Sequence, residues 1–149
     1  MTLLRGTVAH NIGYGLDPNK EDPDLIRHVA MLCGLACDDH LPNGLETKID
    51  EKGRNLPGGL RARIALARAI VASPRLLLID DFAFVADPHA RNALQSILAE
   101  YKTTVLMVGS EDRDCLDPDQ VWCLKRGKIE IQDLRVKAGI SAVPLKSVK

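Results

Sequence analysis

The chain has few aromatic residues and no net charge. Aromatic side chains make up 3% of its 149 residues, so the core must be built mostly from leucine, isoleucine, valine and alanine. Its 20 basic residues balance its 20 acidic residues. A chain without net charge exerts no strong electrostatic attraction on nucleic acid or anionic lipid. We therefore expect no nucleic-acid partner.

Long apolar runs and paired metal ligands are also missing. No run of about 18 apolar residues occurs, and no apolar stretch of the signal-peptide kind follows the first residues. Cys33 and Cys37 lie one helical turn apart, but no second close pair completes a metal site. We expect no membrane insertion, a cytosolic location (alone or as the cytosolic part of something larger), and buried free thiols for all four cysteines.

Two helices are indicated by their ends and by their periodicity. Asp22 and Pro23 are typical of a helix start, and Gly34 is a plausible stop. Residues 58–71 form a second helix, with an apolar stripe of Leu60, Ile64, Ala67 and Val71. Ser73-Pro74 would end this second helix.

Strand signals follow in the second half of the chain. The continuous apolar runs 76–79 and 103–108 are typical of strands that are buried on both faces of a parallel sheet. A helix over 88–100 connects them into a β–α–β unit. Two further strands, 120–124 and 128–131, predict a hairpin around Arg126-Gly127, and beyond it we expect a loosely held tail. The predicted fold class is α/β.

Residues 55–81 carry a family resemblance. The segment Asn55-Leu56-Pro57-Gly58-Gly59-Leu60, with the Arg- and Ala-rich helix after it, resembles the N-L-S-G-G-Q signature of ABC (ATP-binding-cassette) nucleotide-binding domains. Further on, Arg75-Leu76-Leu77-Leu78-Ile79-Asp80-Asp81 resembles their Walker B strand. Similar matches, from Gly6-Thr7-Val8 to the hairpin Lys125–Ile129, extend the resemblance over about residues 5–131.

The resemblance implies a partial ABC-type P-loop NTPase domain of the exporter kind, with a helical subdomain and a mainly parallel sheet flanked by helices. Residues 1–55 would be the helical, signature-bearing subdomain, residues 56–131 the α/β part, and residues 132–149 a C-terminal tail. The Walker A pattern G-x-x-x-x-G-K-[ST], whose backbone cradles phosphates, does not occur in this sequence. ATP and magnesium are therefore expected only with a partner that supplies that loop.

The same resemblance implies a set of site residues. Asp80 would orient the metal, and Asp81 and Ser110 would stand at the catalytic positions. The residues at nucleotide-binding positions would be Leu56, Pro57, Gly58, Gly59, Leu60 and Asp87.

Several of these positions depart from the family pattern. Pro57 replaces a serine and Leu60 replaces a glutamine, so hydrogen-bond donors to phosphate are lost, although proline is comfortable as a first helical residue. Asp81 replaces a glutamate and is one methylene shorter, while Ser110 replaces a histidine. We expect a degenerate half-site that does not hydrolyse ATP alone.

Two functions follow as hypotheses. The first is the C-terminal part of an ABC transporter ATP-binding subunit that works with a second nucleotide-binding domain and with transmembrane domains, at the cytoplasmic face of the membrane. The second is a non-enzymatic dimerisation or regulatory module derived from such a domain. Both predict an oligomer.

Other polar residues have simpler interpretations. Arg61, Arg63 and Arg68 are expected on a solvated helix face or beside carboxylates, because no aromatic residues interleave with them as in RNA-binding segments. The four histidines show no metal-ligand spacing and are taken as non-catalytic. Asp38-Asp39-His40 is expected at the surface.

Overall fold

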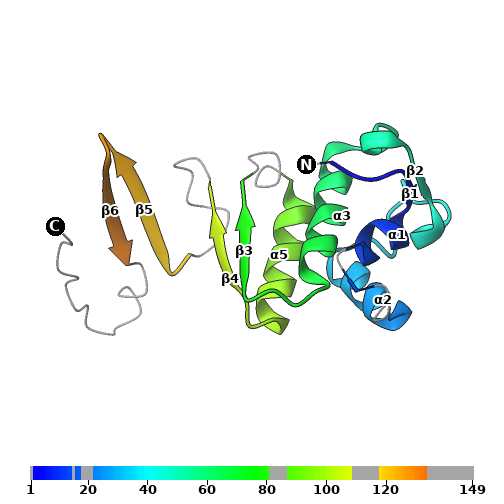
Figure 1. The fold of residues 1–149 in the computed structure, drawn as a ribbon, viewed down its shortest axis with the longest axis horizontal. Helices are drawn as coiled ribbons and strands as arrows, with labels where there is room; N and C mark the ends of the chain where they lie inside the picture. Colours follow the sequence, from blue (N-terminus) through cyan, green and yellow to red (C-terminus); the bar gives the residue numbers. More distant parts are fainter. Residues whose placement is uncertain (1, 15, 18–21, 81–86, 109–117, 134–149) are drawn as a thin grey trace. The chain divides into compact units, whose positions relative to one another are not determined.

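The computed structural model describes residues 2–14, 16–17, 22–80, 87–108 and 118–133 (Figure 1). The chain divides into two units, residues 1–115 and residues 116–149. This division differs from the expected boundaries at residues 55 and 131. The reason lies in α3 (Gly58–Ile70), which packs against α1 and α2 before residue 55 and against α5 after it.

The predicted helix after Asp22 is confirmed at both ends. In α2 (Pro23–Leu32), the carboxylate of Asp22 accepts a hydrogen bond from the backbone N–H of Asp24 at 2.9 Å. After α2, Gly34 has a φ of 64°, which lets the N–H of Leu35 reach the carbonyl of Ala30 at 2.9 Å. This arrangement is a Schellman motif, and it requires a left-handed residue that glycine supplies without strain.

Residues 1–55 are less purely helical than the sequence predicts. Besides α1 (Val8–Gly13) and α2, this region contains a two-stranded antiparallel pair, β1 (Gly6–Thr7) and β2 (Lys48–Ile49). Two 3₁₀ turns, η2 (Gly44–Glu46) and η3 (Glu51–Gly53), flank β2. The strands have two residues each, so they carry no hydrophobic alternation that sequence reasoning could detect.

The two long helices of the first unit agree with the prediction. The whole stripe of α3 is buried, from Leu60 at 2% exposed to Val71 just past the helix end at 1%. Its neighbour α5 (Pro88–Glu100) buries Ala90, Ala93, Leu94 and Ile97. Figure 1 shows α3 and α5 next to each other. The N-terminal ends of both helices lie on the same side of the first unit as the C-terminal end of β3.

The β–α–β unit is confirmed, but the expected burial of its strands on both faces is wrong. Strand β3 (Leu76–Ile79) pairs in parallel with β4 (Thr104–Met107). Leu77 is 7% exposed, whereas its neighbour Leu78 is 65% exposed. The burial alternates because the described part of the first unit covers this sheet on one face only.

The second unit contains the predicted hairpin. Strands β5 (Gln120–Lys125) and β6 (Lys128–Asp133) pair antiparallel, with Trp122 opposite Ile131. Arg126 and Gly127 both have positive φ, 49° and 75°, as a tight two-residue hairpin turn requires. The strand β6 extends to Asp133, so it includes the first two residues of the expected tail. Residues 134–149 of that tail lie outside the described residues.

The prediction of buried thiols is right for one cysteine and wrong for another. Cys33 is fully buried, and burial raises the pKa of its thiol to about 12. Cys37 is exposed because it lies in the loop after α2, and Cys123 is half-buried. All three are free thiols, whereas Cys115 lies outside the described residues. Within the described ranges, no helix combines the length and apolarity needed to cross a membrane.

Candidate functional site

The first turn of α3 is open to solvent. Pro57 is the N-cap residue, one position earlier than expected, with a φ of −56° and a ψ of 152°. The first intrahelical bond runs from the N–H of Arg61 to the carbonyl of Pro57 at 3.0 Å, and no described side chain caps the helix. Pro57 and Gly58 are exposed and Gly59 is half-buried. The helix α3 has 13 residues, and its start therefore offers free N–H groups and a partial positive charge that can meet an anion.

Asp87 lies directly against this turn. A Cβ atom added to Gly59 would overlap the carboxylate oxygen Oδ2 of Asp87, so a larger residue at this position requires the Asp87 side chain to move. The other carboxylate oxygen, Oδ1, accepts a hydrogen bond from the N–H of His89 at 2.9 Å and caps α5. Two predicted nucleotide-binding positions, Gly59 and Asp87, are thus in contact within one chain.

A pocket of about 450 Å³ lies at this place. Three segments of the first unit supply its lining: the loop after α2, the start of α3 and the start of α5. The lining residues are Asp38, His40, Pro57, Gly59, Leu60, Arg63, Asp87 and His89.

An ion pair links the loop after α2 to α3. Arg63 donates from Nη2 to Oδ2 of Asp38 and from Nη1 to the carbonyl of Gly34 at 2.7 Å. The side chains of Asp38 and Arg63 are only 12% and 7% exposed. Burial raises the pKa of Asp38. Hydrogen bonds from Arg63 and from the backbone and ring of His40 lower this pKa by more than burial raises it, so the net shift is downward.

This pair corrects two expectations. Asp38 is largely buried and not a surface residue, although Asp39 and His40 are exposed as expected. Arg63 is not on a solvated face, and its interpretation as a carboxylate partner is confirmed. Both outcomes follow because an ion pair with additional hydrogen bonds permits charges to be buried that would otherwise stay in water.

Arg63 still has one unsatisfied donor. Its Nε is buried and has no hydrogen-bond partner among the described residues. Buried donors of this kind are rare in folded proteins, so this one calls for an acceptor. The residues that the structure describes contain no group of three metal-ligating side chains.

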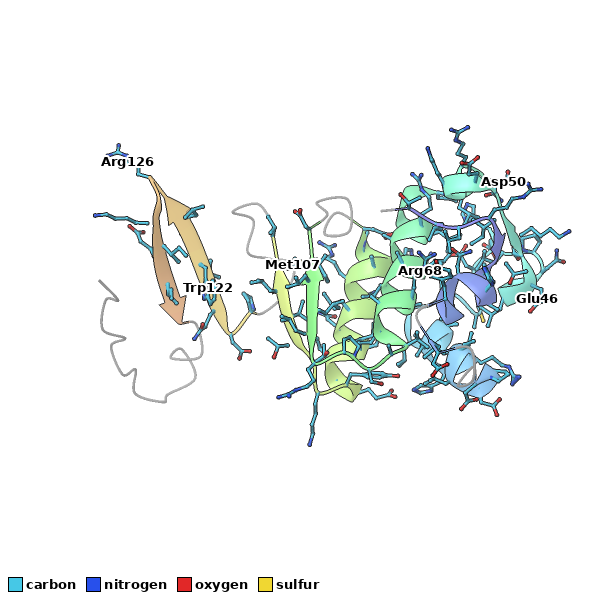
Figure 2. All side chains as sticks on the ribbon, viewed as in Figure 1. Glu46, Asp50, Arg68, Met107, Trp122 and Arg126 are labelled. Atoms are coloured by element: carbon cyan, nitrogen blue, oxygen red, sulfur yellow. The ribbon has the colours of Figure 1, made fainter. Side chains whose placement is uncertain are left out.

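The last turns of α3 are held differently. Arg68 donates to the backbone carbonyl of Asn11 at 2.8 Å, to the carbonyl of Thr2 at 3.2 Å, and to the side-chain oxygen of Asn11. Its guanidinium also lies 5.8 Å from the ring centre of Tyr14. Figure 2 shows Arg68 between α3 and α1. These contacts tie the N-terminal segment to α3.

The remaining predicted site residues are dispersed. Leu56 and Leu60 are buried, at 7% and 2% exposed, so their side chains belong to the core, although Leu60 also lines the pocket. Asp80 is exposed and immediately follows β3. The predicted catalytic positions Asp81 and Ser110 lie outside the described residues.

Sequence reasoning did not place His40, Arg63 and His89 at the site. For Arg63 a signal existed, because it falls three residues after Leu60 and four before Ala67, inside the apolar stripe of α3. For the two histidines no local signal exists, since they belong to segments about 50 residues apart. Only the packing of α5 beside α3 brings them to one pocket.

The nucleotide expected from the sequence fits this arrangement on one side only. An uncapped helix start next to a glycine with no room for a side chain suits close approach of a phosphate. Nothing in the sequence supplies the loop that would hold the phosphates from the other side.

Fold and site together define a mixed α/β chain in which a parallel strand pair and a diglycine-opened helix form part of a nucleotide-binding domain. The chain is homologous to ABC exporters over most of its length. A comparison with models of protein families finds no match.

Three relatives and one solved structure support this homology. Antigen peptide transporter 2 of Rattus norvegicus is 33% identical over 131 residues, or 88% of this chain and 18% of that protein. The mitochondrial iron-sulfur clusters transporter atm1 of Aspergillus fumigatus is 34% identical, over 85% of this chain and 18% of that protein. For the ATP-dependent lipid A-core flippase of Nitrosococcus oceani the values are 33%, 85% and 22%.

The structural similarity also covers most of the chain. A bacterial Atm1-family ABC exporter with ATP bound superimposes with a TM-score of 0.73 and 27% identity, over 93% of this chain and 25% of the exporter chain. The chain therefore spans about a fifth to a quarter of the length of the exporters it matches.

Proposed function

We propose that the chain supplies the signature face of a shared ATP site whose phosphate-binding loop belongs to a second nucleotide-binding domain. The observation that carries this proposal is the exposed, uncapped start of α3 at Gly58-Gly59. Free N–H groups and the helix dipole favour an anion there. In this proposal the partner brings the anion, and residues 1–149 contain no Walker A pattern.

In this proposal the ATP and magnesium are held mainly by the partner. Asp80, exposed at the end of β3, is the position that would orient the metal. Asp81 and Ser110 would stand near the reacting water. Both would be less effective there than the glutamate and histidine of the family pattern. Because a displaced base loses much of its effect, the chain alone does not hydrolyse ATP, and it binds ATP more weakly than about 1 mM.

The partners are then those of an exporter. A second nucleotide-binding domain would close over the start of α3, and transmembrane domains would receive the resulting motion at the cytoplasmic face of the membrane. The exporters that resemble the chain carry names of transporters and flippases, which supports a role in transport. The chain would contribute closure of the site and not its hydrolytic chemistry.

The test is ATP turnover in a mixture. An exporter nucleotide-binding domain with intact Walker A and a disabled signature is assayed with and without the chain. We expect turnover to rise several-fold with the chain, and the rise to disappear with Gly58→Glu, because a carboxylate at an exposed helix start repels phosphate. Lys128→Ala in the hairpin is the control variant. A mixture that never exceeds the partner alone contradicts the proposal.

The second candidate function, a non-enzymatic docking module, rests on Pro57 and on Asp87. Pro57 offers neither a hydroxyl nor an N–H, and the Asp87 carboxylate already lies against Gly59. Both reduce the attraction for phosphate. Complex formation in sedimentation without any gain in turnover would favour this function over the shared ATP site.

A further inference from the structure

The hairpin of the second unit has one apolar face that is open to solvent. Strands β5 and β6 place Trp122 opposite Ile131 and Leu124 opposite Ile129, so these four side chains share one face. Trp122 is 56% exposed, Leu124 74%, Ile129 59% and Ile131 48%. The positions that alternate with them, such as Cys123, belong to the other face. A contiguous apolar surface of this kind marks an interaction site.

This face needs a cover that the hairpin itself does not supply. The described part of the second unit, residues 118–133, contains no element besides β5 and β6. A two-stranded hairpin alone is only marginally stable in water, and packing of its apolar side stabilises it. Trp122 is the largest side chain of the face, and aromatic residues supply much of the binding energy at protein interfaces. The face therefore has the composition of a docking surface.

The charges at the two ends of the hairpin are self-complementary. Asp119 is exposed just before β5 begins, and Arg126 is exposed at the turn where β5 ends (Figure 2). Two hairpins that pack face to face and antiparallel would bring Arg126 of each copy toward Asp119 of the other. A two-fold axis produces such an arrangement, because it makes the same surface of both copies meet. The chain has no net charge, so two copies do not repel each other at long range.

We propose that the apolar face of the hairpin is a self-association surface through which the chain pairs with a second copy of itself. Stable interfaces use about 20–30 residues a side, so a face of this size gives a weak dimer, with a dissociation constant of about 10–100 µM. The inference is independent of the shared ATP site, because the hairpin belongs to the second unit and α3 to the first.

An anionic membrane surface fits this hairpin less well than a second copy does. Attraction to anionic lipid requires an excess of basic residues. Residues 118–133 balance three basic residues against three acidic ones, namely Lys125, Arg126 and Lys128 against Asp119, Glu130 and Asp133. Opposite charges in equal number suit an identical partner.

The test follows the fluorescence of Trp122, which is the one tryptophan of the chain. The whole chain is diluted across the expected range while sedimentation velocity reports its mass. We expect the emission maximum to move to shorter wavelength as the mass rises from one chain to two, because the indole leaves water in the dimer. An emission maximum that does not depend on concentration, or a dimer that forms without a change in emission, would overturn the inference. A shift that appears only with phosphatidylserine vesicles would also overturn it, by assigning the face to lipid.

The chain offers a matched pair of variants. Leu124→Glu places a carboxylate in the apolar face, so the dissociation constant should rise at least about tenfold, because burial of an unpaired charge is costly. Leu78→Glu makes the same change at a similarly exposed leucine of β3, 65% against 74% exposed, and should leave the dissociation constant unchanged. Equal weakening by both substitutions would show non-specific association of apolar surface and contradict the inference.

A third variant, Arg126→Asp, tests the charged ends separately. Arg126 has a φ of 49°, and aspartate suits positive φ in a hairpin turn, so this variant keeps the fold. It brings like charges together at Asp119 of the other copy, and the dissociation constant should rise about threefold. An unchanged value would overturn the antiparallel packing on which the inference rests. If Leu124→Glu does not fold, this variant and the dilution series of the wild type still decide.

Discussion

The two ends of α3 are built in opposite ways. At its C-terminal end, Arg68 and Asn11 form a closed network in which the fully buried amide of Asn11 has a partner for each of its polar atoms. At its N-terminal end no described side chain caps the helix, and Nε of Arg63 has no acceptor among the described residues. Among the described residues, the polar groups are paired at the C-terminal end of α3 and incompletely paired at its N-terminal end.

Because of this difference, we expect the C-terminal end of α3 to matter mainly for stability and its N-terminal end mainly for binding. A closed network adds stability and tolerates no change, because each atom that is removed leaves a partner unsatisfied. The open end has fewer paired polar groups, so substitutions of its exposed residues Pro57 and Gly58 should change stability less. The departures from the family pattern, Pro57 and Leu60, both lie at the open end, while the framework at the closed end is intact.

The largest effect is expected from breaking the closed end. Asn11→Ala removes bonds to the backbone N–H and carbonyl of Leu4 and to the carbonyl of Thr7, each 2.9 Å long, as well as the bond from Arg68. Buried groups left unsatisfied cost about 1–3 kcal/mol each. We expect the free energy of unfolding to fall by about 3 kcal/mol or more, measured by urea denaturation and circular dichroism.

The control is the same substitution at an exposed position, Asn92→Ala in α5, which should change the free energy of unfolding by less than about 0.5 kcal/mol. Equal midpoints for the two variants would show that the network at Asn11 does not hold the N-terminal segment to α3.

The next effect tests the glycine pair at the open end. In Gly59→Ala the new methyl group overlaps Oδ2 of Asp87, so the free energy of unfolding should fall by about 1–3 kcal/mol. In Gly58→Ala the nearest neighbour of the methyl group among the described residues is Nη2 of Arg61 at 3.8 Å, an ordinary contact. That variant should keep its stability or gain up to about 1 kcal/mol.

A double-variant cycle sharpens this prediction. If the cost of Gly59→Ala comes from Asp87, it should shrink in the Asp87→Ala background, because the overlapping carboxylate is then gone. Additive costs of the two substitutions would mean that Asp87 moves away freely, and the contact between them would have no structural importance.

A smaller effect is expected from acid. The folded-state pKa of Asp38 lies below its ordinary value of 3.8. Its contribution to stability is therefore present above the unfolded pKa and is lost as the pH falls through the folded pKa. One proton accounts for a slope of at most about 1.4 kcal/mol per pH unit. Urea midpoints from pH 6 to 2.5 should fall less steeply below pH 4 in Asp38→Asn than in the wild type, and parallel curves would contradict this.

The contrast between the ends of α3 also explains what the sequence could predict. Asp22, Gly34 and the stripe from Leu60 to Val71 act over a few residues, so the starts and stops of α2 and α3 follow from local chemistry. The same holds for the glycine-opened turn and for the hairpin at Arg126-Gly127.

Long-range contacts lay beyond sequence reasoning. The pairing of Gly6 with Ile49 joins strands of two residues across more than 40 positions. The burial of Arg63 depends on Asp38, 25 residues earlier. The open face of β3 at Leu78 depends on what covers the sheet, which an apolar run does not reveal.

The smallest effect on stability is expected from closing the open end. Pro57→Ser supplies a capping hydroxyl, worth about 1 kcal/mol, but it gives up the rigidity of proline, worth about 0.4–1 kcal/mol. The net change should stay within about 0.5 kcal/mol. Pro57→Ala gives up the same rigidity without a cap, so the serine variant should be about 1 kcal/mol more stable than the alanine variant. Equal midpoints of the two would mean that the first turn of α3 already has a cap, and the open end would not be open.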